Sequence, residues 1–157
     1  MNLNQPEKRF MHYIKEIAAT ETHLIRHAVL RIDKPLETCR FEGDVLESTK
    51  HFGLFAEGQR CGIVSLYETN SPLFETNNQF QLRGMAVLPE YHKLGYGKCL
   101  LRHCEEFIES KGGALIWFNA RLIAVGFYGK MGYETFGDAF EVADVGQHYV
   151  MHKTIIS

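Results

Sequence analysis

The sequence predicts an α/β fold, a sandwich on a mixed, mostly antiparallel sheet of about six to seven strands. Two observations carry this prediction: β-rich runs bounded by turn residues, and segments with the apolar spacing of helices. The expected order is strand, helix, three strands, helix, strand, helix and two strands. No repeat, linker or low-complexity segment divides the 157 residues, so we expect a single domain over residues 1–157.

The first elements are a strand and a helix. Residues 11–17, rich in Tyr and Ile, are expected to form the strand. Thr20 can cap a helix that continues through apolar residues toward Leu30. Residues 31–50 lose this periodicity and contain a proline, a glycine and many charges, which indicates a loop with at most short helical turns.

Three antiparallel strands should follow this loop. Residues 51–56 and 61–67 are β-rich, and the glycine-bearing turn between them predicts a hairpin. A second turn at 71–78 leads into a strand at 79–88. Pro89 ends that strand because proline cannot donate a hydrogen bond to a neighbouring strand.

The C-terminal part begins with a helix expected from Gly95 to the glycine pair at 112–113. Its apolar residues recur at helical spacing, and glycine can adopt the left-handed conformation that ends a helix. The apolar run 114–119 has the length of a strand. A short strand to Phe136, a Gly-Asp loop and a last strand at 148–154 should complete the sheet.

Composition and charge exclude several classes of protein. The chain is 45% apolar, 23% charged and 12% aromatic, which is typical of a globular protein. A net charge of -2 without runs of like charge argues against a nucleic-acid partner. No apolar run reaches the ~20 residues of a membrane span, and residues 1–9 lack the apolar core of a secretion signal. We therefore expect a cytoplasmic protein without a membrane partner; a homodimer is left open.

Cysteine and histidine spacing predicts no metal site. The four cysteines are Cys39, Cys61, Cys99 and Cys104. Without C-x-x-C spacing they are expected to be reduced thiols, and a covalent acyl-cysteine is the alternative for one of them. His23 and His27 lie four residues apart on the expected helix, but no third ligand is visible, so we expect surface histidines.

The segment with the clearest chemistry joins the strand at 79–88 to the next helix. Gly95 and Gly97 lie on the first helical turn, where backbone N–H groups are unpaired and the helix dipole is positive. The glycines let a bulky anion approach the main chain, and Lys93 and Lys98 add positive charge. We predict a phosphate site, with an ordinary turn that needs glycine for its dihedral angles as the alternative.

Two familiar phosphate-binding loops do not fit this segment. A P-loop would end in Gly-Lys-Ser or Gly-Lys-Thr, and this ending is absent. A dinucleotide fingerprint would place a third glycine where Leu100 stands.

The segment resembles the acetyl-CoA signature of the GNAT family of N-acetyltransferases, Q/R-x-x-G-x-G/A, which lies between the fourth strand and the following helix. Gly95 and Gly97 match both glycines, and Leu100 and Leu101 match the leucines that usually follow. His92 departs from the family, which prefers Gln or Arg at the first position. This departure affects only the contact from that side chain, because backbone amides do most of the phosphate binding.

A second match strengthens the resemblance. Phe127, Tyr128, Gly132 and Tyr133 fill every defined position of the closing family motif F-Y-x-x-x-G-F/Y. The apolar strand at 114–119 precedes this motif, as it does in the family. The chain is therefore identified as a member of the GNAT family over nearly its whole length.

The resemblance implies acetyl-CoA as co-substrate, helices on both faces of the sheet, and fourth and fifth strands that splay apart after Val87 to admit the pantetheine arm. The implied cofactor-binding residues are Met85, Ala86, Val87, His92, Lys93, Leu94, Gly95, Tyr96, Gly97, Lys98, Asn119 and Tyr128. A backbone N–H near residues 85–87 would polarise the thioester carbonyl. Capping of the following helix is the alternative role for Asn119.

The resemblance also implies that Tyr128, a phenol with an ordinary pKa near 10, supplies a proton to the leaving thiolate. Its alternative is a core tyrosine whose hydroxyl caps a backbone group. No motif marks the general base, for which the candidates are Glu68, Glu90, Asp44, His51 or a chain of water. The implied acceptor site contains Arg26, Arg31, Glu37, Arg40, Phe41 and Asp44, with residues near Tyr149. The charged loop hints at a polar acceptor, and a solvated surface loop is the alternative.

The implied function is transfer of an acetyl group from acetyl-CoA to a primary amine of a small molecule or peptide, by direct attack in a ternary complex. The alternative is a non-catalytic acyl-CoA-binding sensor or subunit that kept the phosphate site and lost turnover. The expected partners are acetyl-CoA and an amine acceptor.

Overall fold

A computed structural model describes residues 11–156; residues 1–9, on which the expectation about a secretion signal rests, lie outside this range. The described chain forms a seven-stranded sheet in the order β1-β2-β3-β4-β5-β7-β6. It divides into two compact units. The first holds the chain up to Leu66 together with Gly84–His103, and the second holds Tyr67–Arg83 and the chain from Cys104 onward. β4 (Gln79–Val87) and α2 (Tyr96–Ser110) each contribute to both units.

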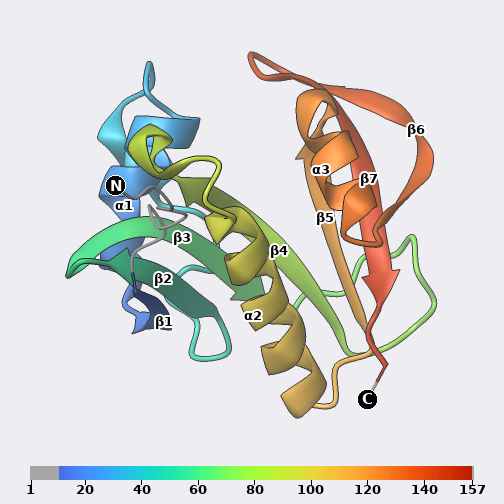
Figure 1. The fold of residues 1–157 in the computed structure, drawn as a ribbon. Coiled ribbons are helices and arrows are strands. Elements are labelled where there is room, and N and C mark those ends of the chain that lie inside the picture. Colours follow the sequence, from blue (N-terminus) through green and yellow to red (C-terminus); the bar gives the residue numbers. More distant parts are fainter. Residues whose placement is uncertain (1–10, 157) are drawn as a thin grey trace, which may run out of the picture. The chain divides into compact units, whose positions relative to one another are not determined.

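Two antiparallel pairings build the sheet of the first unit. β1 (His12–Ile17) pairs with β2 (Lys50–Ala56), and β2 pairs with β3 (Gln59–Tyr67) (Figure 1). The turn between β2 and β3 is Glu57-Gly58, with φ values of 53° and 77°. Positive φ at both residues is typical of the tight hairpin turn whose twist matches that of the strands. The predicted hairpin is confirmed.

Gly58→Ala is expected to lower the free energy of unfolding by about 1–2 kcal/mol, because alanine would have to adopt the left-handed conformation. A Cβ at Gly58 would meet no atom within 4 Å, so no clash contributes to this loss. Gly126→Ala is the matched control, since its Cβ would also meet nothing. Gly126 lies in a helix, where alanine is expected to raise stability by about 0.5 kcal/mol. Urea unfolding measures both variants, and undiminished stability of Gly58→Ala would contradict the turn conformation.

The helical segment after β1 is irregular. It consists of a 3-10 turn (Ala19–Thr22), the short α1 (His23–Ile25) and a π-helical stretch (Arg26–Leu30). The predicted cap at Thr20 is wrong. The N-cap is Ala18, two residues earlier, and the side chain of Glu21 accepts a hydrogen bond of 2.8 Å from the N–H of Ala18. The sequence signal for this helix start is the acidic residue at the third helical position, as in a capping box.

The core of the first unit lies between this helical segment and the strands. Its buried members are Ile17, Ile25, Phe55, Ile63 and Ala86, with Val29, Leu30 and Leu88 packed against them. They come from β1, the helical segment, β2, β3 and the end of β4. Burial of their apolar surface fixes the helical segment beside the last residues of β4.

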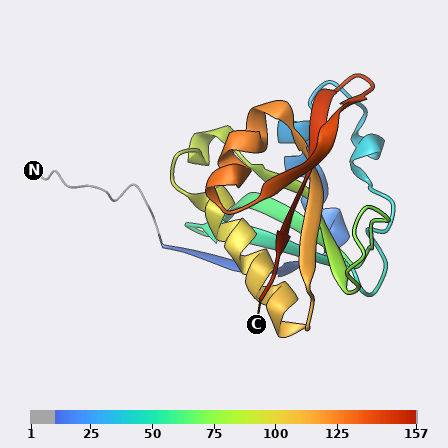
Figure 2. The same cartoon turned by 90° about the vertical axis from the view of Figure 1, so that its right-hand side faces the viewer.

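The second unit contains β5 (Leu115–Arg121), α3 (Val125–Lys130), β6 (Glu134–Val142) and β7 (Gly146–Thr154). β7 pairs antiparallel with both β5 and β6, and α3 lies beside these strands (Figures 1 and 2). The predicted loop at Gly137-Asp138 is wrong. These residues lie inside β6, where the register with β7 shifts between Phe136 and Phe140. Gly137 has a φ of 77°, so it produces a bulge and not the end of the strand.

The parallel pairing of β4 with β5 is short. It covers three residue pairs, from Gln79 with Leu115 to Gln81 with Trp117. The mixed sheet of the predicted fold class is thereby confirmed. The resemblance placed the parting of these strands after Val87, whereas their pairing ends at Gln81. Further along β4, Gly84 has a φ of 65°, a left-handed residue that interrupts the extended conformation.

α2 agrees with the predicted helix. Its buried face contains Leu100, Leu101, Cys104 and Ile108, all fully buried. The helix ends where the N–H of Gly113 donates to the carbonyl of Ile108 at 2.8 Å. Gly112 has a φ of 74°, the left-handed conformation expected at a helix end. None of the helices in residues 11–156 is long and apolar enough to span a membrane.

All four cysteines are free thiols, and three of them, Cys39, Cys61 and Cys104, are buried. Cys61 donates a hydrogen bond to the carbonyl of Leu54. Burial raises the pKa of the Cys61 thiol from 9.0 to about 11. Within residues 11–156, no three His, Cys, Asp or Glu side chains are grouped as metal ligands would be.

The raised pKa of Cys61 predicts a loss of stability in alkali. Because the folded state holds this proton more tightly, the stabilisation is complete below pH 9 and disappears as the pH rises to about 11. The expected loss is roughly 2–3 kcal/mol in the free energy of unfolding. Urea unfolding between pH 8 and pH 11 should show a steeper decline for the wild type than for Cys61→Ala. Parallel declines would contradict this contribution.

Candidate functional site

The turn between β4 and α2 presents backbone N–H groups at the start of a long helix. A 3-10 turn (Pro89–Tyr91) follows β4. Lys93 and Gly95 have φ values of 67° and 82°. The carbonyl of Gly95 accepts a hydrogen bond of 3.0 Å from the N–H of Cys99, so Gly95 caps the helix. The N–H groups of the first helical turn have no partner within the helix and lie at its positive end.

Residues 92–98, which we call the phosphate cradle, can hold an anion mainly through the main chain. Gly95, Lys93 and Lys98 are exposed, and Gly97 is half-buried. Tyr96 is buried, and its ring lies 5.0 Å from that of His12. Tyr96 can therefore offer a ligand only its backbone. Exposed glycine backbone flanked by two ammonium groups fits a pyrophosphate.

His92 has a partner that the sequence did not reveal. Its Nε2 lies 2.8 Å from the carbonyl oxygen of Val87. A carbonyl only accepts hydrogen bonds, so the Nε2–H of His92 donates this bond. The side chain thus ties the cradle to the end of β4. This contact is made by the side chain at the position where the family prefers Gln or Arg.

The end of β4 carries the backbone predicted to receive the acyl group. Met85 and Val87 are half-buried and Ala86 is buried. Immediately before them, a Cβ at Gly84 would lie 3.2 Å from Phe41 Cε2 and 3.3 Å from Arg26 Nε. Sequence reasoning missed Gly84, although a glycine inside a strand pattern is a signal for a bulge or a close backbone approach.

The Arg26 cluster, formed by Arg26, Phe41, Asp44, His51 and Ser65, lies in the first unit, and all its members are buried except the half-buried Phe41. Arg26 is fully buried and donates to both carboxylate oxygens of Asp44, at 2.7 and 3.1 Å. It also donates to the carbonyl of Cys39 at 2.8 Å and to Ser65 Oγ at 2.9 Å. The ring of Phe41 lies 3.9 Å from the guanidinium carbon.

The cluster changes the interpretation of several candidates. Arg26 and Asp44 were expected to contact the acceptor, but they are bound to each other inside the protein. Asp44 is also removed as a general base, because its carboxylate is committed to Arg26. His51 is buried, with its ring nitrogens 2.6 Å from Ser65 Oγ and 2.9 Å from the carbonyl of Asp44. Glu37 and Arg40 remain exposed, Arg31 is half-buried, and Glu90 is exposed beside the cradle.

Tyr128 lies in an aromatic cluster of the second unit. It is 8% exposed, and its ring centroid is 4.3 Å from that of Phe118 and 6.0 Å from that of Tyr133. Burial raises the pKa of the Tyr128 phenol above its usual value, and Cys104 adds to this effect. The described residues include no hydrogen-bond partner for its hydroxyl, so the alternative of a backbone cap gains no support.

Tyr133, the last residue of the closing motif, is fixed by a charged group on α2. Its hydroxyl donates to Glu105 Oε2 at 2.6 Å, and Lys153 Nζ lies 3.2 Å from the same oxygen. Burial and this hydrogen bond raise the pKa of the Tyr133 phenol. Gly132 has a φ of 95°, which explains the glycine before it. The motif is therefore partly structural, because Tyr133 packs against Tyr128.

Asn119 is exposed on β5, opposite Val150 of β7. The helical turns that follow are capped by Arg121 and Ala124, so helix capping as its role is wrong. Tyr149 is half-buried on β7.

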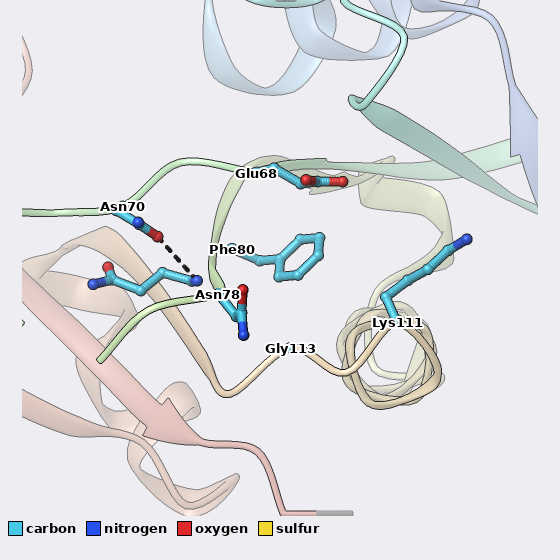
Figure 3. Close-up of a pocket in the computed structure, with 7 residues that line it drawn as sticks. Glu68, Asn70, Asn78, Phe80, Lys111 and Gly113 are labelled. Carbon is cyan, nitrogen blue, oxygen red and sulfur yellow. Dashed lines mark hydrogen bonds between the residues drawn. The ribbon is translucent and has the colours of Figure 1, made fainter. Parts of the chain in front are cut away.

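A separate polar pocket of about 320 Å³ lies in the second unit (Figure 3). Its lining residues are Glu68, Asn70, Asn78, Gln79, Phe80, Lys111 and Gly113. Asn70 Oδ1 accepts a hydrogen bond of 3.0 Å from the N–H of Gln79, the first residue of β4. Glu68, a candidate base, thus lies with the start of β4, whereas residues 85–87 form its end.

Solved structures share this fold. The ribosomal-protein-S18-alanine N-acetyltransferase from Escherichia coli matches with a TM-score of 0.73 at 20% identity, covering 92% of this chain and 94% of that one. An aminoglycoside 6'-N-acetyltransferase in complex with coenzyme A matches with a TM-score of 0.73 at 15% identity, covering 92% and 98%. These two likenesses show the fold, in which β4 and β5 pair over a short stretch and a glycine turn precedes α2.

Sequence comparison gives the family. The model of the acetyltransferase (GNAT) family matches residues 11–133. The uncharacterized N-acetyltransferase YitI of Bacillus subtilis (strain 168) is 34% identical over 142 residues, which cover 90% of this chain and 95% of that protein. The chain belongs to the GNAT family, whose members transfer acetyl groups from acetyl-CoA.

Proposed function

We propose that this protein transfers the acetyl group of acetyl-CoA to a primary amine of a small molecule or peptide, by direct attack in a ternary complex. The observation that carries this proposal is the phosphate cradle, in which exposed glycine backbone at the start of α2 lies beside Lys93 and Lys98. The cradle residues bind the pyrophosphate, and the backbone of Met85, Ala86 and Val87 binds the pantetheine arm and the thioester carbonyl. Asn119 and Tyr128 complete the proposed set of contacts.

Tyr128 assists departure of the thiolate. Since burial raises its pKa, the phenol is neutral at physiological pH and can donate a hydrogen bond. A thiol is a stronger acid than a phenol, so complete transfer of the Tyr128 proton to sulfur is uphill by itself. The attacking amine gives up one proton as the C–N bond forms and the C–S bond breaks. A phenolate with a raised pKa readily takes up that proton, so the exchange leaves Tyr128 neutral again.

The acceptor amine must be neutral when it attacks. Two carboxylates of the first unit are candidates for the general base. Glu90 is exposed and close in sequence to the cradle, whereas Asp44 is bound to Arg26. We propose that Glu90 or water removes the proton. The exposed side chains of Glu37 and Arg40 are available to an acceptor.

Thiol release from acetyl-CoA across a panel of small amines and N-terminal peptides tests the proposed function. Turnover above the background with at least one amine is expected. Calorimetric binding of CoA to the same protein distinguishes the alternative. Tight CoA binding without turnover on any amine would contradict the enzyme and support a non-catalytic acyl-CoA-binding protein.

A further inference from the structure

We propose that Arg26 and Phe41 are positioning residues for the backbone that receives the thioester carbonyl, and that they act through their contact with Gly84. This inference rests on the proposed function, because it assigns the carbonyl-binding role to residues 85–87. It gives the buried Arg26 cluster a part in the reaction other than binding the acceptor.

Gly84 controls the direction of the peptide groups that follow it. Its φ of 65° departs from the extended conformation of β4. In a strand, such a residue redirects the next peptide plane and leaves local backbone groups unpaired. The N–H groups of residues 85–87 therefore depend on the dihedral angles of Gly84. Anything that moves Gly84 changes where they point.

Arg26 and Phe41 form the surface against which Gly84 rests. A Cβ at Gly84 would lie 3.2 Å from the Phe41 ring and 3.3 Å from Arg26 Nε, which is tighter than ordinary contact. The space between Gly84 and these two side chains is therefore too small for a methyl group. The backbone approach is possible because glycine lacks a side chain.

This surface is itself fixed at several points. The guanidinium of Arg26 makes four hydrogen bonds, to Asp44, Cys39 and Ser65. Phe41 is held from both sides, because its ring lies on the guanidinium and its N–H donates to Asp44 Oδ2 at 2.9 Å. The N–H of Asp44 returns a hydrogen bond to the carbonyl of Phe41 at 3.1 Å. The main chain of Phe41 is therefore held by the carboxylate that binds Arg26, and its ring packs on the guanidinium of the same pair.

A chain of hydrogen bonds through Ser65 and His51 fixes the Arg26 cluster to the sheet, and each donor in this chain has an acceptor. Arg26 Nη2 donates to Ser65 Oγ, which leaves the Ser65 proton to be donated to His51 Nδ1 at 2.6 Å. His51 then carries its proton on Nε2 and donates it to the carbonyl of Asp44 at 2.9 Å. His51 and Ser65 are paired residues of β2 and β3. Hydrogen bonds to residues of these two strands thus hold Arg26 in place.

Two non-transferable analogues of acetyl-CoA test this proposal. One is a ketone in which a methylene replaces the thioester sulfur, and the other is the S-ethyl thioether of CoA, which lacks the carbonyl. Calorimetry gives the ratio of their dissociation constants. The wild type is expected to bind the ketone about five-fold more tightly, the factor that one hydrogen bond supplies.

Phe41→Leu is the deciding variant, because it removes the flat ring and leaves the Arg26–Asp44 pair. Its preference for the ketone is expected to fall to about unity while its affinity for the thioether stays within about two-fold of the wild type. Gly84→Ala is expected to lose the preference as well. Phe52→Leu is the matched control, an aromatic-to-leucine change at a buried residue of the same unit that lies outside the core cluster containing Ala86. It should lower stability and keep the ratio.

Retention of the ketone preference in folded Phe41→Leu would overturn the proposal, and so would equal affinities of the wild type for the two analogues. Equal weakening of both ligands in Phe41→Leu would assign the residue a purely structural role and would also overturn it. The ratio is measured without an acceptor. If no amine is acetylated but the ketone preference depends on Phe41, the proposed transferase function fails while the positioning role stands.

Discussion

Gly97→Glu is expected to abolish binding of CoA. Gly97 lies in the first turn of α2, where N–H groups are unpaired and the helix dipole is positive. A glutamate there would place a side chain in the space required by the pyrophosphate and a negative charge beside its phosphates. The dissociation constant should rise by about a thousand-fold or more, as expected when steric and charge conflict act together.

The fold should survive this substitution, because glutamate is a better helix former than glycine and an acidic residue is favourable in the first turn. Calorimetry with CoA measures the affinity, and urea unfolding should show undiminished stability. Ser110→Glu is the matched control, since it adds the same charge at the other end of α2. Its affinity for CoA should stay within about two-fold of the wild type. Unaltered binding of CoA by Gly97→Glu would refute the placement of the pyrophosphate.

Tyr128→Phe is expected to lower kcat by about a hundred-fold, the lower range for loss of a general acid. The variant keeps the aromatic ring that packs against Phe118 and removes only the hydroxyl. The dissociation constant of CoA should therefore change by less than about two-fold. Steady-state kinetics with an accepted amine, together with CoA calorimetry, measure both quantities.

Tyr133→Phe is the matched control, because it removes a hydroxyl from the same aromatic cluster. That hydroxyl is bound to Glu105, so its loss should cost about 1–2 kcal/mol of stability. Its kcat should stay within about three-fold of the wild type. An unchanged kcat in Tyr128→Phe, or an equal loss in both variants, would contradict the role of Tyr128 as acid.

The pH dependence of kcat offers an independent check on Tyr128. A group that must be protonated limits the rate only above its pKa, and the pKa of Tyr128 is raised above 10.0. Because this phenol stays protonated up to about pH 10, its titration should not lower kcat below that pH. A fall in kcat at lower pH that disappears in Tyr128→Phe would contradict the raised pKa.

Local sequence signals were sufficient for a large part of the fold. The hairpin at Glu57-Gly58, the buried face of α2 and its glycine end depend on neighbouring residues, and the structure has them where the sequence predicts them. The helical segment after β1 was harder to delimit. Its start is decided by Glu21, whereas the hydroxyl of Thr20 predicts a start two residues later.

Burial of charged residues could not be predicted from their spacing. Arg26 and Asp44 are eighteen positions apart, and nothing in the sequence indicates that they form a bidentate pair. Charged residues are seldom fully buried, and the resemblance to the family placed both residues in the acceptor site. Their pairing arises because the helical segment and the loop pack on the same strands, where an unpaired charge would be costly to bury.

The sequence by itself determined the family and the glycine-bearing helix start that we propose binds phosphate, because a glycine turn and the start of a helix are both encoded locally. It also determined the closing motif around Tyr128. The tertiary structure decided the rest: the tie from His92 to Val87, the fixing of Tyr133 by Glu105, and the contact of Arg26 and Phe41 with Gly84. The last two join residues distant in the sequence, and all three depend on how helices and loops pack against the ends of strands.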